Sequence, residues 1–331
     1  MFAIGVLAPS LQGGEIQEVS AYDQQVLELR QGETVVRVAP ESGANVFSIK
    51  VGGVEFLHQP ESASRLKGVF SGVPLLYPTP NRVKDSEFTF GDQRVEFAPN
   101  AGPNFIHGIV HSEQWQVEDQ TLNENSVAIT LVLSFENGGK LHNQFPFTHR
   151  LRLRLTVAAR SVTWKYTVDN SDGTGPVPFG FALHPYFVYQ KERAETFLTI
   201  PAEFQMEATK QLPSGKLVTA EELDHPLGEP FSLKNTKFDD VFFGINGDTI
   251  IDFRDVGRRI TIRGDKSFTH LVVWTPQRPF FGVESQTCST DAHNLHSKGF
   301  ENVAHLQVCA PGEQLSGEVQ YTFQTGQEQN Q

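Results

Sequence analysis

Cysteine is scarce in this sequence. The 331 residues contain two, Cys288 and Cys309, which lie far apart and lack the close spacing of a metal site. Two thiols in a chain this long are typical of a reducing compartment, although the sequence remains compatible with one disulfide. We therefore expect a cytoplasmic protein without a disulfide framework.

Positive charge is also in short supply. Lysine and arginine total 27 against 39 acidic residues, which gives a formal net charge of −12, and no basic run offsets this excess. Most of such a surface would repel a polyanion. The composition therefore argues against nucleic acid as a partner.

Long apolar runs are missing as well. No segment approaches the ~20 consecutive apolar residues that a membrane-spanning helix needs. The first ten residues, MFAIGVLAPS, are mostly apolar, but no positive charge precedes the apolar run. This pattern is a poor match to a secretory signal peptide, so we predict neither secretion nor a membrane partner.

Helical periodicity is weak, and short alternating segments take its place. Between Leu151 and Val157 every second residue is aliphatic, and alternation resumes from Val162 to Val168 after a turn, which predicts a β-hairpin. The best helix candidate is 219–225, where Thr219 precedes Glu222 by three residues. Many short strands with turn residues between them indicate one all-β antiparallel domain, a sandwich or barrel, over residues 1–331. We expect the polar tail 326–331 to be frayed.

Polar, titratable side chains occur in five short stretches among turn residues or aromatics. A histidine beside aromatic residues is more often a core residue than a catalyst, and Asp239 beside Asp240 is compatible with a solvated strand edge. Glu284 is more informative, because an apolar strand rarely buries a carboxylate without a partner. The five candidates are Arg82 in PTPNRV, His107 in NFIHGIV, His184 in FGFALHPYF, Asp239 in KFDDVFFG and Glu284 in FFGVESQT.

Six motifs in a fixed order resemble the aldose 1-epimerases of the galactose mutarotase-like superfamily. The motifs are LLYPTPNRV, FIHG, ALHPYF, LPSG, FDDVF and FGVESQT, and the resemblance runs from about Gly43 to the last strand. It implies an all-β fold, a large twisted antiparallel β-sandwich with very little helix. It also implies a sugar bound in an open cleft across one sheet.

The resemblance also implies roles for individual residues. Glu284 matches the general base that acts on the anomeric hydroxyl, and His184 matches the acid that protonates the ring oxygen. His107 and Arg82 match groups that bind and polarise the sugar, and Asp239 matches an aspartate that holds sugar hydroxyls. Asn81 is expected to hold the Arg82 loop.

Such chemistry needs one acid and one base but no cofactor. Ring opening removes the O1 proton and protonates the ring oxygen, so a carboxylate and an imidazolium on opposite sides of the C1–O5 unit suffice. A nearby carboxylate is expected to favour the charged form of His184. His107 and His111 are four residues apart but have no Cys or carboxylate at ligand spacing, so no metal is predicted.

Some positions depart from the family pattern. Ser285 follows Glu284 where many relatives have proline, and His111 stands where related hexose-6-phosphate epimerases have arginine. Together with the Asn81–Arg82 pair, His111 favours a free hexose over a phosphosugar. The prediction is an epimerase of a free hexose such as galactose or glucose, as a monomer or weak dimer. A hexose-6-phosphate 1-epimerase and a non-catalytic carbohydrate-binding protein are the alternatives.

The other histidines and the tryptophans receive structural interpretations. His142, His149, His293 and His296 are expected at loops or edges. The three tryptophans, Trp115, Trp164 and Trp274, are expected mainly in the core.

Overall fold

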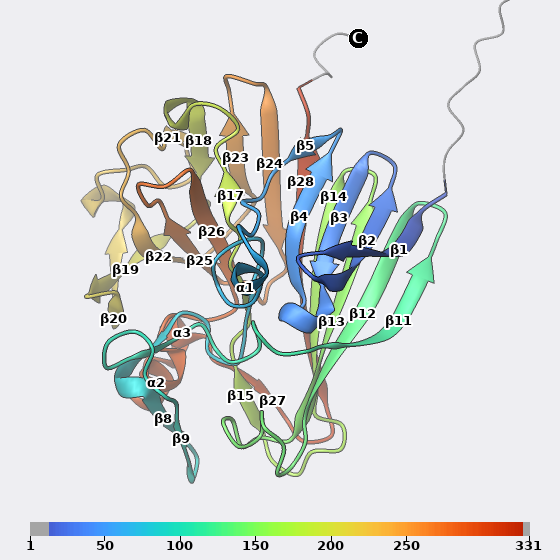
Figure 1. Cartoon of the computed structure of the whole chain (residues 1–331). Coiled ribbons are helices and arrows are strands. Elements are labelled where there is room, and N and C mark those ends of the chain that lie inside the picture. The colour runs from blue at the N-terminus through green and yellow to red at the C-terminus, as the bar shows by residue number, and fades with distance from the viewer. Residues whose placement is uncertain (1–12, 327–331) are drawn as a thin grey trace, which may run out of the picture.

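The computed structural model describes residues 13–326, so the predictions about the first ten residues and about nearly all of the tail lie outside the described residues. The described chain is dominated by β-strands, and every paired strand is antiparallel to its neighbour (Figure 1). The all-β fold class predicted from the sequence is confirmed. No helix within this range is long and apolar enough to cross a membrane.

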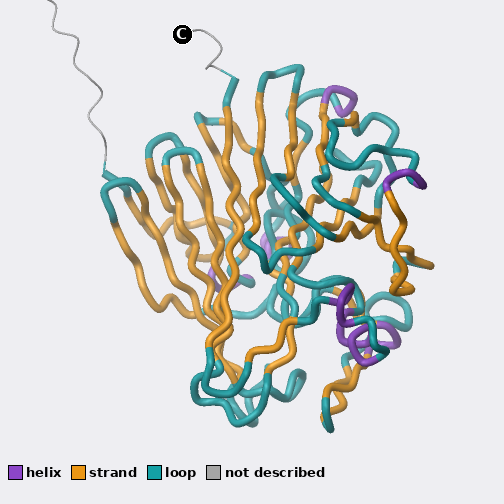
Figure 2. Tube along the Cα trace, turned by 180° about the vertical axis from the view of Figure 1, so that it is seen from behind, coloured by secondary structure: helices purple, strands orange, loops and turns teal. Residues whose placement is uncertain are grey.

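The largest sheet forms the back of the molecule and contains the longest strands (Figure 2). In spatial order it consists of β11 (Gln116–Leu122), β12 (Ser126–Phe135), β13 (His149–Ala158), β14 (Ser161–Asp169), β28 (Gln314–Gln324), β24 (Arg258–Gly264), β23 (Thr249–Phe253), β18 (Thr196–Thr199) and β21 (Phe231–Ser232).

A smaller sheet packs against one half of this large sheet, where β2 and β3 contact β12 and β13. It contains β1 (Glu15–Ala21), β2 (Gln24–Gln31), β3 (Thr34–Ala39), β4 (Asn45–Val51) and β5 (Val54–Glu55).

A third sheet, of eight strands, covers the other half. Its order is β20 (Leu212–Thr219), β19 (Phe204–Thr209), β22 (Asp239–Phe243), β25 (His270–Trp274), β26 (Phe280–Gln286), β16 (Ala182–Leu183) and β6 (Leu75–Leu76), and β17 (Phe187–Val188) also pairs with β26.

Short pairs and helices fill the connections. The two-stranded pairs are β7 (Arg82–Val83) with β10 (Phe105–Ile106), β8 (Glu87–Phe90) with β9 (Gln93–Glu96), and β15 (Val177–Phe179) with β27 (Gln307–Cys309). The α-helices are α1 (Ala63–Leu66), α2 (Ala292–Ser297) and α3 (Glu301–Ala304), and the 3-10 helices are η1 (Pro40–Ser42), η2 (Lys84–Ser86), η3 (Arg193–Glu195) and η4 (Ala220–Glu222). The helix predicted at 219–225 is this single turn, and Glu222 accepts a hydrogen bond from the Thr219 amide at 3.0 Å.

Aromatic rings join the sheets across the core. Phe281 of β26 meets Phe253 of β23 with ring centroids 6.5 Å apart, and Phe187 of β17 meets Tyr321 of β28 at 5.7 Å. These side chains belong to one continuous buried cluster that reaches from Leu27 to Phe323. The sandwich is therefore held mainly by apolar burial between its sheets.

The predicted hairpin is confirmed. Strands β13 and β14 pair over their full length around the turn at Ala159 and Arg160. The aliphatic residues of β13 are fully buried, whereas Arg152 on the opposite face donates to Asp169 and Glu118. Alternation thus sorts the residues into a core face and an ion-paired outer face.

Two histidines and one tryptophan lie in surroundings that differ from the sequence-based expectation. His149 in β13 and His293 in α2 are not at exposed loops or edges, because these residues are only 5% and 3% exposed. Trp274 is partly exposed rather than a core residue. Cys288 and Cys309 are both buried free thiols and form no disulfide.

Candidate active site

Strand β26 carries Glu284 on the outer face of the eight-stranded sheet. Its neighbours Phe281 and Val283 point into the core cluster, so the two-residue period directs Glu284 and Gln286 to the opposite side. Val272 of β25 lies directly beside Glu284 and belongs to a small second core on that outer side. The carboxylate is consequently buried, with 2% of its residue exposed.

His184 reaches this carboxylate from the end of β16. Ala182 of that strand pairs with Gln286 of β26 and with Leu76 of β6, which fixes β16 between them. The His184 amide then donates to the Pro74 carbonyl at 3.0 Å. His184 Nε2 lies 3.3 Å from Glu284 Oε1, and Gln286 Nε2 donates to the other carboxylate oxygen at 3.1 Å.

The expected charges of this pair are wrong. Burial raises the pKa of Glu284 to about 8 and lowers the pKa of His184 to about 4. Near neutrality the pair therefore holds one proton and favours a carboxylic acid beside a neutral imidazole. The removal of water penalises both charged forms more than the mutual attraction favours them.

The expected separation of the pair is also wrong. A sugar C1–O5 unit was predicted to lie between the two groups, but Nε2 and Oε1 are in direct contact. Each group is a polar partner of the other in a largely apolar setting, since His184 stacks on Tyr186 with ring centroids 4.7 Å apart and meets the Trp274 ring edge-on at 5.9 Å.

Asn81, Arg82 and His107 come from one two-stranded pair. Arg82 of β7 lies opposite Ile106 of β10, and the His107 amide donates to the Asn81 carbonyl at 2.9 Å. Asn81 and His107 both adopt the left-handed backbone region, with φ of 54° and 75°. Arg82 Nη1 donates to the Asn81 side chain at 3.1 Å, which is what a residue that holds Arg82 should do.

The paired strands β7 and β10 place His107 beside the dyad formed by Glu284 and His184. The His107 and His184 rings meet edge-on with centroids 5.2 Å apart. Burial, together with the neighbouring His184, His111 and Arg82, lowers the pKa of His107 well below its usual value, so His107 is a neutral polar group at pH 7. Its buried Nδ1 has no hydrogen-bond partner in residues 13–326. Arg82 is close enough to the dyad that its charge lowers the pKa of Glu284.

Asp239 completes the set at the edge of the same face. It begins β22 opposite Trp274, which pairs with Gly282, two residues before Glu284. Directly paired residues point to the same side of a sheet, so the exposed Asp239 faces the same side as Glu284. Its negative charge raises the pKa of Glu284. The structure thus brings together all six residues singled out from the sequence.

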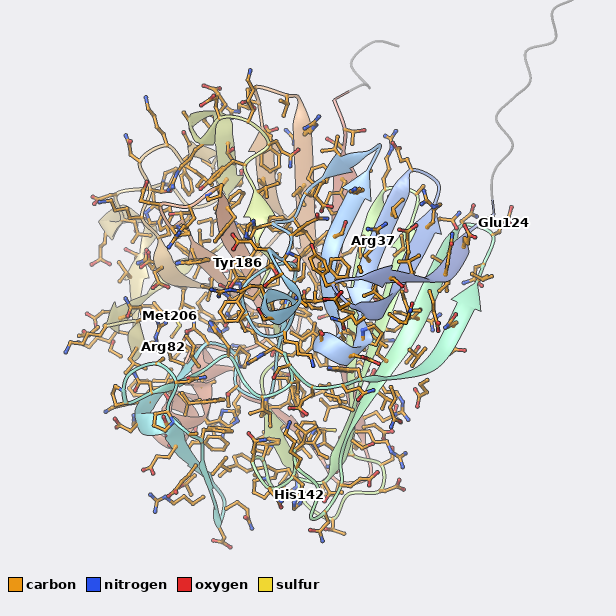
Figure 3. All side chains as sticks on the ribbon, in the orientation of Figure 1. Arg37, Arg82, Glu124, His142, Tyr186 and Met206 are labelled. Atoms are coloured by element: carbon orange, nitrogen blue, oxygen red, sulfur yellow. The ribbon has the colours of Figure 1, made fainter. Side chains whose placement is uncertain are left out.

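Figure 3 places Arg82, Tyr186 and Met206 on one side of the molecule, away from Arg37 and Glu124 on the five-stranded sheet and the β11–β12 edge. Met206 belongs to the small core that covers part of the outer face next to Glu284. The site therefore lies on the eight-stranded sheet, not on the outer faces of the other two.

Sequence reasoning missed Asp291 as part of this region. Its amide donates to the Arg82 carbonyl at 2.8 Å, and its carboxylate accepts from the Lys84 amide at 2.9 Å and from Asn294 at 2.7 Å. Asp291 thus holds the backbone directly after Arg82, with one hydrogen bond on each side of Val83. Gln286 was also missed, although its two-residue offset from Glu284 was a usable signal.

The sequence predicted no metal site at His107 and His111. No group of three or more potential metal ligands occurs among residues 13–326. Burial lowers the pKa of His111, which favours the neutral form of this histidine.

A family model decides the identification. The model of the aldose 1-epimerases matches residues 25–322. The chain belongs to the aldose 1-epimerase family. Among curated relatives of this family member, the LacX protein encoded on a Lactococcus lactis plasmid is 25% identical over 257 residues, which cover 73% of the chain and 81% of LacX. The aldose 1-epimerase of Escherichia coli K12 is 29% identical over 121 residues, or 35% of the chain and 32% of that enzyme.

Solved structures share the fold. A galactose mutarotase-like protein from Clostridium acetobutylicum superposes with a TM-score of 0.83 at 18% identity, covering 95% of this chain and 99% of that one. The galactose 1-epimerase from Lactobacillus acidophilus gives a TM-score of 0.76 at 15% identity, with 96% and 100% covered. These likenesses confirm the large antiparallel sandwich of the family.

Proposed function

We propose that this member of the aldose 1-epimerase family interconverts the α and β anomers of a free hexose such as galactose or glucose. The observation that carries the proposal is the buried Glu284–His184 dyad, 3.3 Å from Nε2 to Oε1, which holds one proton near neutrality. A pure sugar-binding site has no need of such a dyad.

The proposed reaction begins with transfer of the shared proton to His184. Transfer across the contact turns the neutral pair into a carboxylate and an imidazolium. Glu284 then takes the O1 proton while His184 gives its proton to the ring oxygen O5, and the C1–O5 bond breaks. Rotation about C1–C2 followed by closure on the other face returns each proton and completes the exchange of anomers.

The neighbouring residues would bind and polarise the sugar. Arg82 and neutral His107 can donate hydrogen bonds to oxygens near C1, and the exposed Asp239 can accept from more distant hydroxyls. The sugar must exchange the direct contact within the dyad for contacts through O1 and O5.

The role of Ser285 follows from strand alternation. It is adjacent to Glu284 in β26, so its side chain points to the core side of the sheet, away from the sugar. We therefore propose that the serine in place of the family's proline leaves the chemistry intact. We also propose a cytoplasmic protein, monomeric or weakly dimeric, with a small sugar as its partner.

Polarimetry, or NMR anomer exchange, on fresh α-D-galactose and α-D-glucose tests the proposal directly. The wild type should accelerate mutarotation above the spontaneous rate, and Glu284→Gln should lose about 10²–10⁴-fold in kcat. Ser285→Pro is the matched control in the same strand and should stay within a few-fold of wild type. No acceleration of either sugar would contradict the proposal, and so would full activity of Glu284→Gln.

A further inference from the structure

Arg193, which is not one of the six site residues, donates hydrogen bonds to four backbone carbonyls. Its Nε donates to Leu233 at 3.0 Å and its Nη1 to Pro276 at 2.8 Å. Its Nη2 donates to Thr236 at 2.7 Å and to Thr275 at 3.3 Å. No carboxylate within residues 13–326 forms an ion pair with this guanidinium. The side chain therefore links two segments of the chain through their backbones.

These two segments adjoin the ends of neighbouring strands in the eight-stranded sheet. Segment 233–238 leads into Asp239, the first residue of β22. Residues 275–276 directly follow Trp274, the last residue of β25, and Asp239 lies opposite Trp274. Because the ends of an element open more readily than its middle, the positions of Asp239 and Trp274 depend on what holds the adjoining segments.

Thr275 joins the two segments beside the arginine. Its amide donates to the Phe238 carbonyl at 2.9 Å, and its hydroxyl accepts from the Phe238 amide at 2.8 Å. The same hydroxyl accepts from the Thr236 hydroxyl at 3.1 Å, and Thr275 is only 1% exposed. In the described chain, the carbonyls of Thr236, Thr275 and Pro276 accept no hydrogen bond except those from Arg193. Loss of the guanidinium would leave these carbonyls without a protein donor.

The 3-10 helix η3, which Arg193 begins, is itself attached to the large sheet. The Ser232 hydroxyl of β21 donates to the Ala194 carbonyl at 2.6 Å. The Arg254 amide, directly after β23, donates to the Glu195 carbonyl at 3.0 Å. Arg193 thus connects the nine-stranded sheet to the ends of β22 and β25 in the eight-stranded sheet.

The chemistry of the side chain explains why an arginine occupies this place. A guanidinium has five N–H donors fixed in one plane, so it can serve several carbonyls in different directions at once. A lysine ammonium carries three donors on a single atom and cannot reach the same set. The four hydrogen bonds therefore fix the distance between the two segments, which a single bond would not do.

We propose that Arg193 is a positioning residue for the part of the site that binds the unreactive end of the sugar. It holds Asp239, which would accept from hydroxyls distant from C1, at a fixed place beside Trp274. Glu284 and His184 belong to other strands, so the acid–base chemistry itself does not require Arg193. This inference rests on the proposed epimerase function and deepens it, because it assigns part of the affinity for the sugar to a residue that does not contact it.

Mutarotation kinetics of Arg193→Met on galactose test the proposal. Methionine keeps an unbranched side chain but has no donor, so KM should rise about tenfold while kcat stays within about threefold. Arg193→Lys keeps some of the donors and should recover part of the loss. Arg254→Met is the matched control, because its guanidinium packs over the Phe197 ring at 3.5 Å and lies 3.8 Å from Asp252. KM should not change in this control.

A double mutant shows whether Arg193 acts through Asp239. Arg193→Met should raise KM about tenfold in the wild-type background and less than twofold in an Asp239→Asn background. Thermal melts should show that each variant is folded at the assay temperature, and Arg193→Lys replaces Arg193→Met in the comparison if the latter does not fold. An unchanged KM, or equal increases in the two backgrounds, would overturn the positioning role.

A measurement that does not depend on catalysis separates this inference from the proposed function. In ¹⁵N–¹H spectra, the indole signal of Trp274 should shift in Arg193→Met, while the signals of the buried Trp115 and Trp164 stay in place. Arg254→Met should shift none of the three. If no sugar is epimerised, the proposed function fails, yet a selective shift of Trp274 still supports the positioning role. An unchanged Trp274 signal rejects that role whatever the activity.

Discussion

Two buried histidines, His149 and His184, have similar burial but different partners. Each is 5% exposed, and burial lowers the pKa of each to about 4. His149 has a partner on both nitrogens, since Nε2 meets the Tyr77 hydroxyl at 2.6 Å and Nδ1 meets the Phe147 carbonyl at 2.7 Å. His184 has a carboxylate at Nε2 and, within residues 13–326, no partner at Nδ1.

This difference shows what separates a structural histidine from a chemical one. Burial and the resulting pKa shift are common to both and therefore carry little information about role. A satisfied ring such as His149 fixes neighbouring segments in place. A ring left with an open nitrogen and a titratable neighbour retains the capacity to exchange a proton, which is the property that catalysis uses.

Replacement of His184 should have the largest effect on activity. His184→Gln removes the imidazole that protonates the ring oxygen, so kcat for anomer exchange should fall about 10²–10⁴-fold. Far-UV circular dichroism and a thermal melt should show a folded protein at the assay temperature. Retained wild-type kcat in a folded variant would show that His184 is a core residue like His149.

The pH dependence of kcat/KM should follow from the single proton of the dyad. Below about pH 4 His184 takes up a second proton and the pair loses its base, and above about pH 8 Glu284 loses the last proton and the pair loses its acid. We expect a bell-shaped profile in which kcat/KM falls about tenfold per pH unit below the lower and above the upper of these two pH values. The measurement is NMR anomer exchange with the spontaneous rate subtracted, and a profile still rising at pH 9 would contradict the shared-proton model.

Asp291→Ala should have a moderate effect that acts through Arg82. The substitution removes the carboxylate that accepts from the Lys84 amide, so the Arg82 segment loosens and kcat/KM should fall about tenfold, mainly through KM. Asp291→Asn keeps an oxygen acceptor and should recover most of the loss. Equal losses in both variants, or a loss confined to kcat, would argue against this positioning role.

His149→Leu should have the smallest effect on activity and a clear effect on stability. The Tyr77 hydroxyl would be left buried without its partner, which should cost about 1–3 kcal/mol in the free energy of unfolding. Urea titration measures that cost, and kcat should remain within about twofold of wild type. A large loss of kcat in folded protein would remove the distinction between the two histidines.

Much of the fold was predictable because its signals are local. The alternation in β13 and β14 predicted both the hairpin and the face that each residue occupies. The same two-residue period explains why Glu284 faces away from the core. The motif resemblance then gave roles to the five candidates already singled out from the sequence and added Asn81, and the fold brings all six to one face.

The rest depends on contacts between distant parts of the chain. His149 was taken for a loop or edge residue because its partner Tyr77 lies 72 positions earlier. Asp291 and Lys84 are in contact although they lie 207 positions apart in the sequence, and no local sequence pattern predicts such a contact. The predicted charge of the dyad was wrong because the desolvation of Glu284 and His184 depends on all the groups packed around them.

The short pairing of β7 with β10 also holds the site residues in place independently of the chain that connects these two strands. A backbone hydrogen bond joins His107 directly to Asn81. The residues between them form a long connection that includes the β8–β9 hairpin (Figure 1). The hairpin turns at the exposed Gly91 and Asp92. An inserted peptide or fused domain at that tip would lengthen the connection without changing the hydrogen-bonded residues at its two ends. The hairpin tip is therefore a natural place to graft a label or a second module onto this protein.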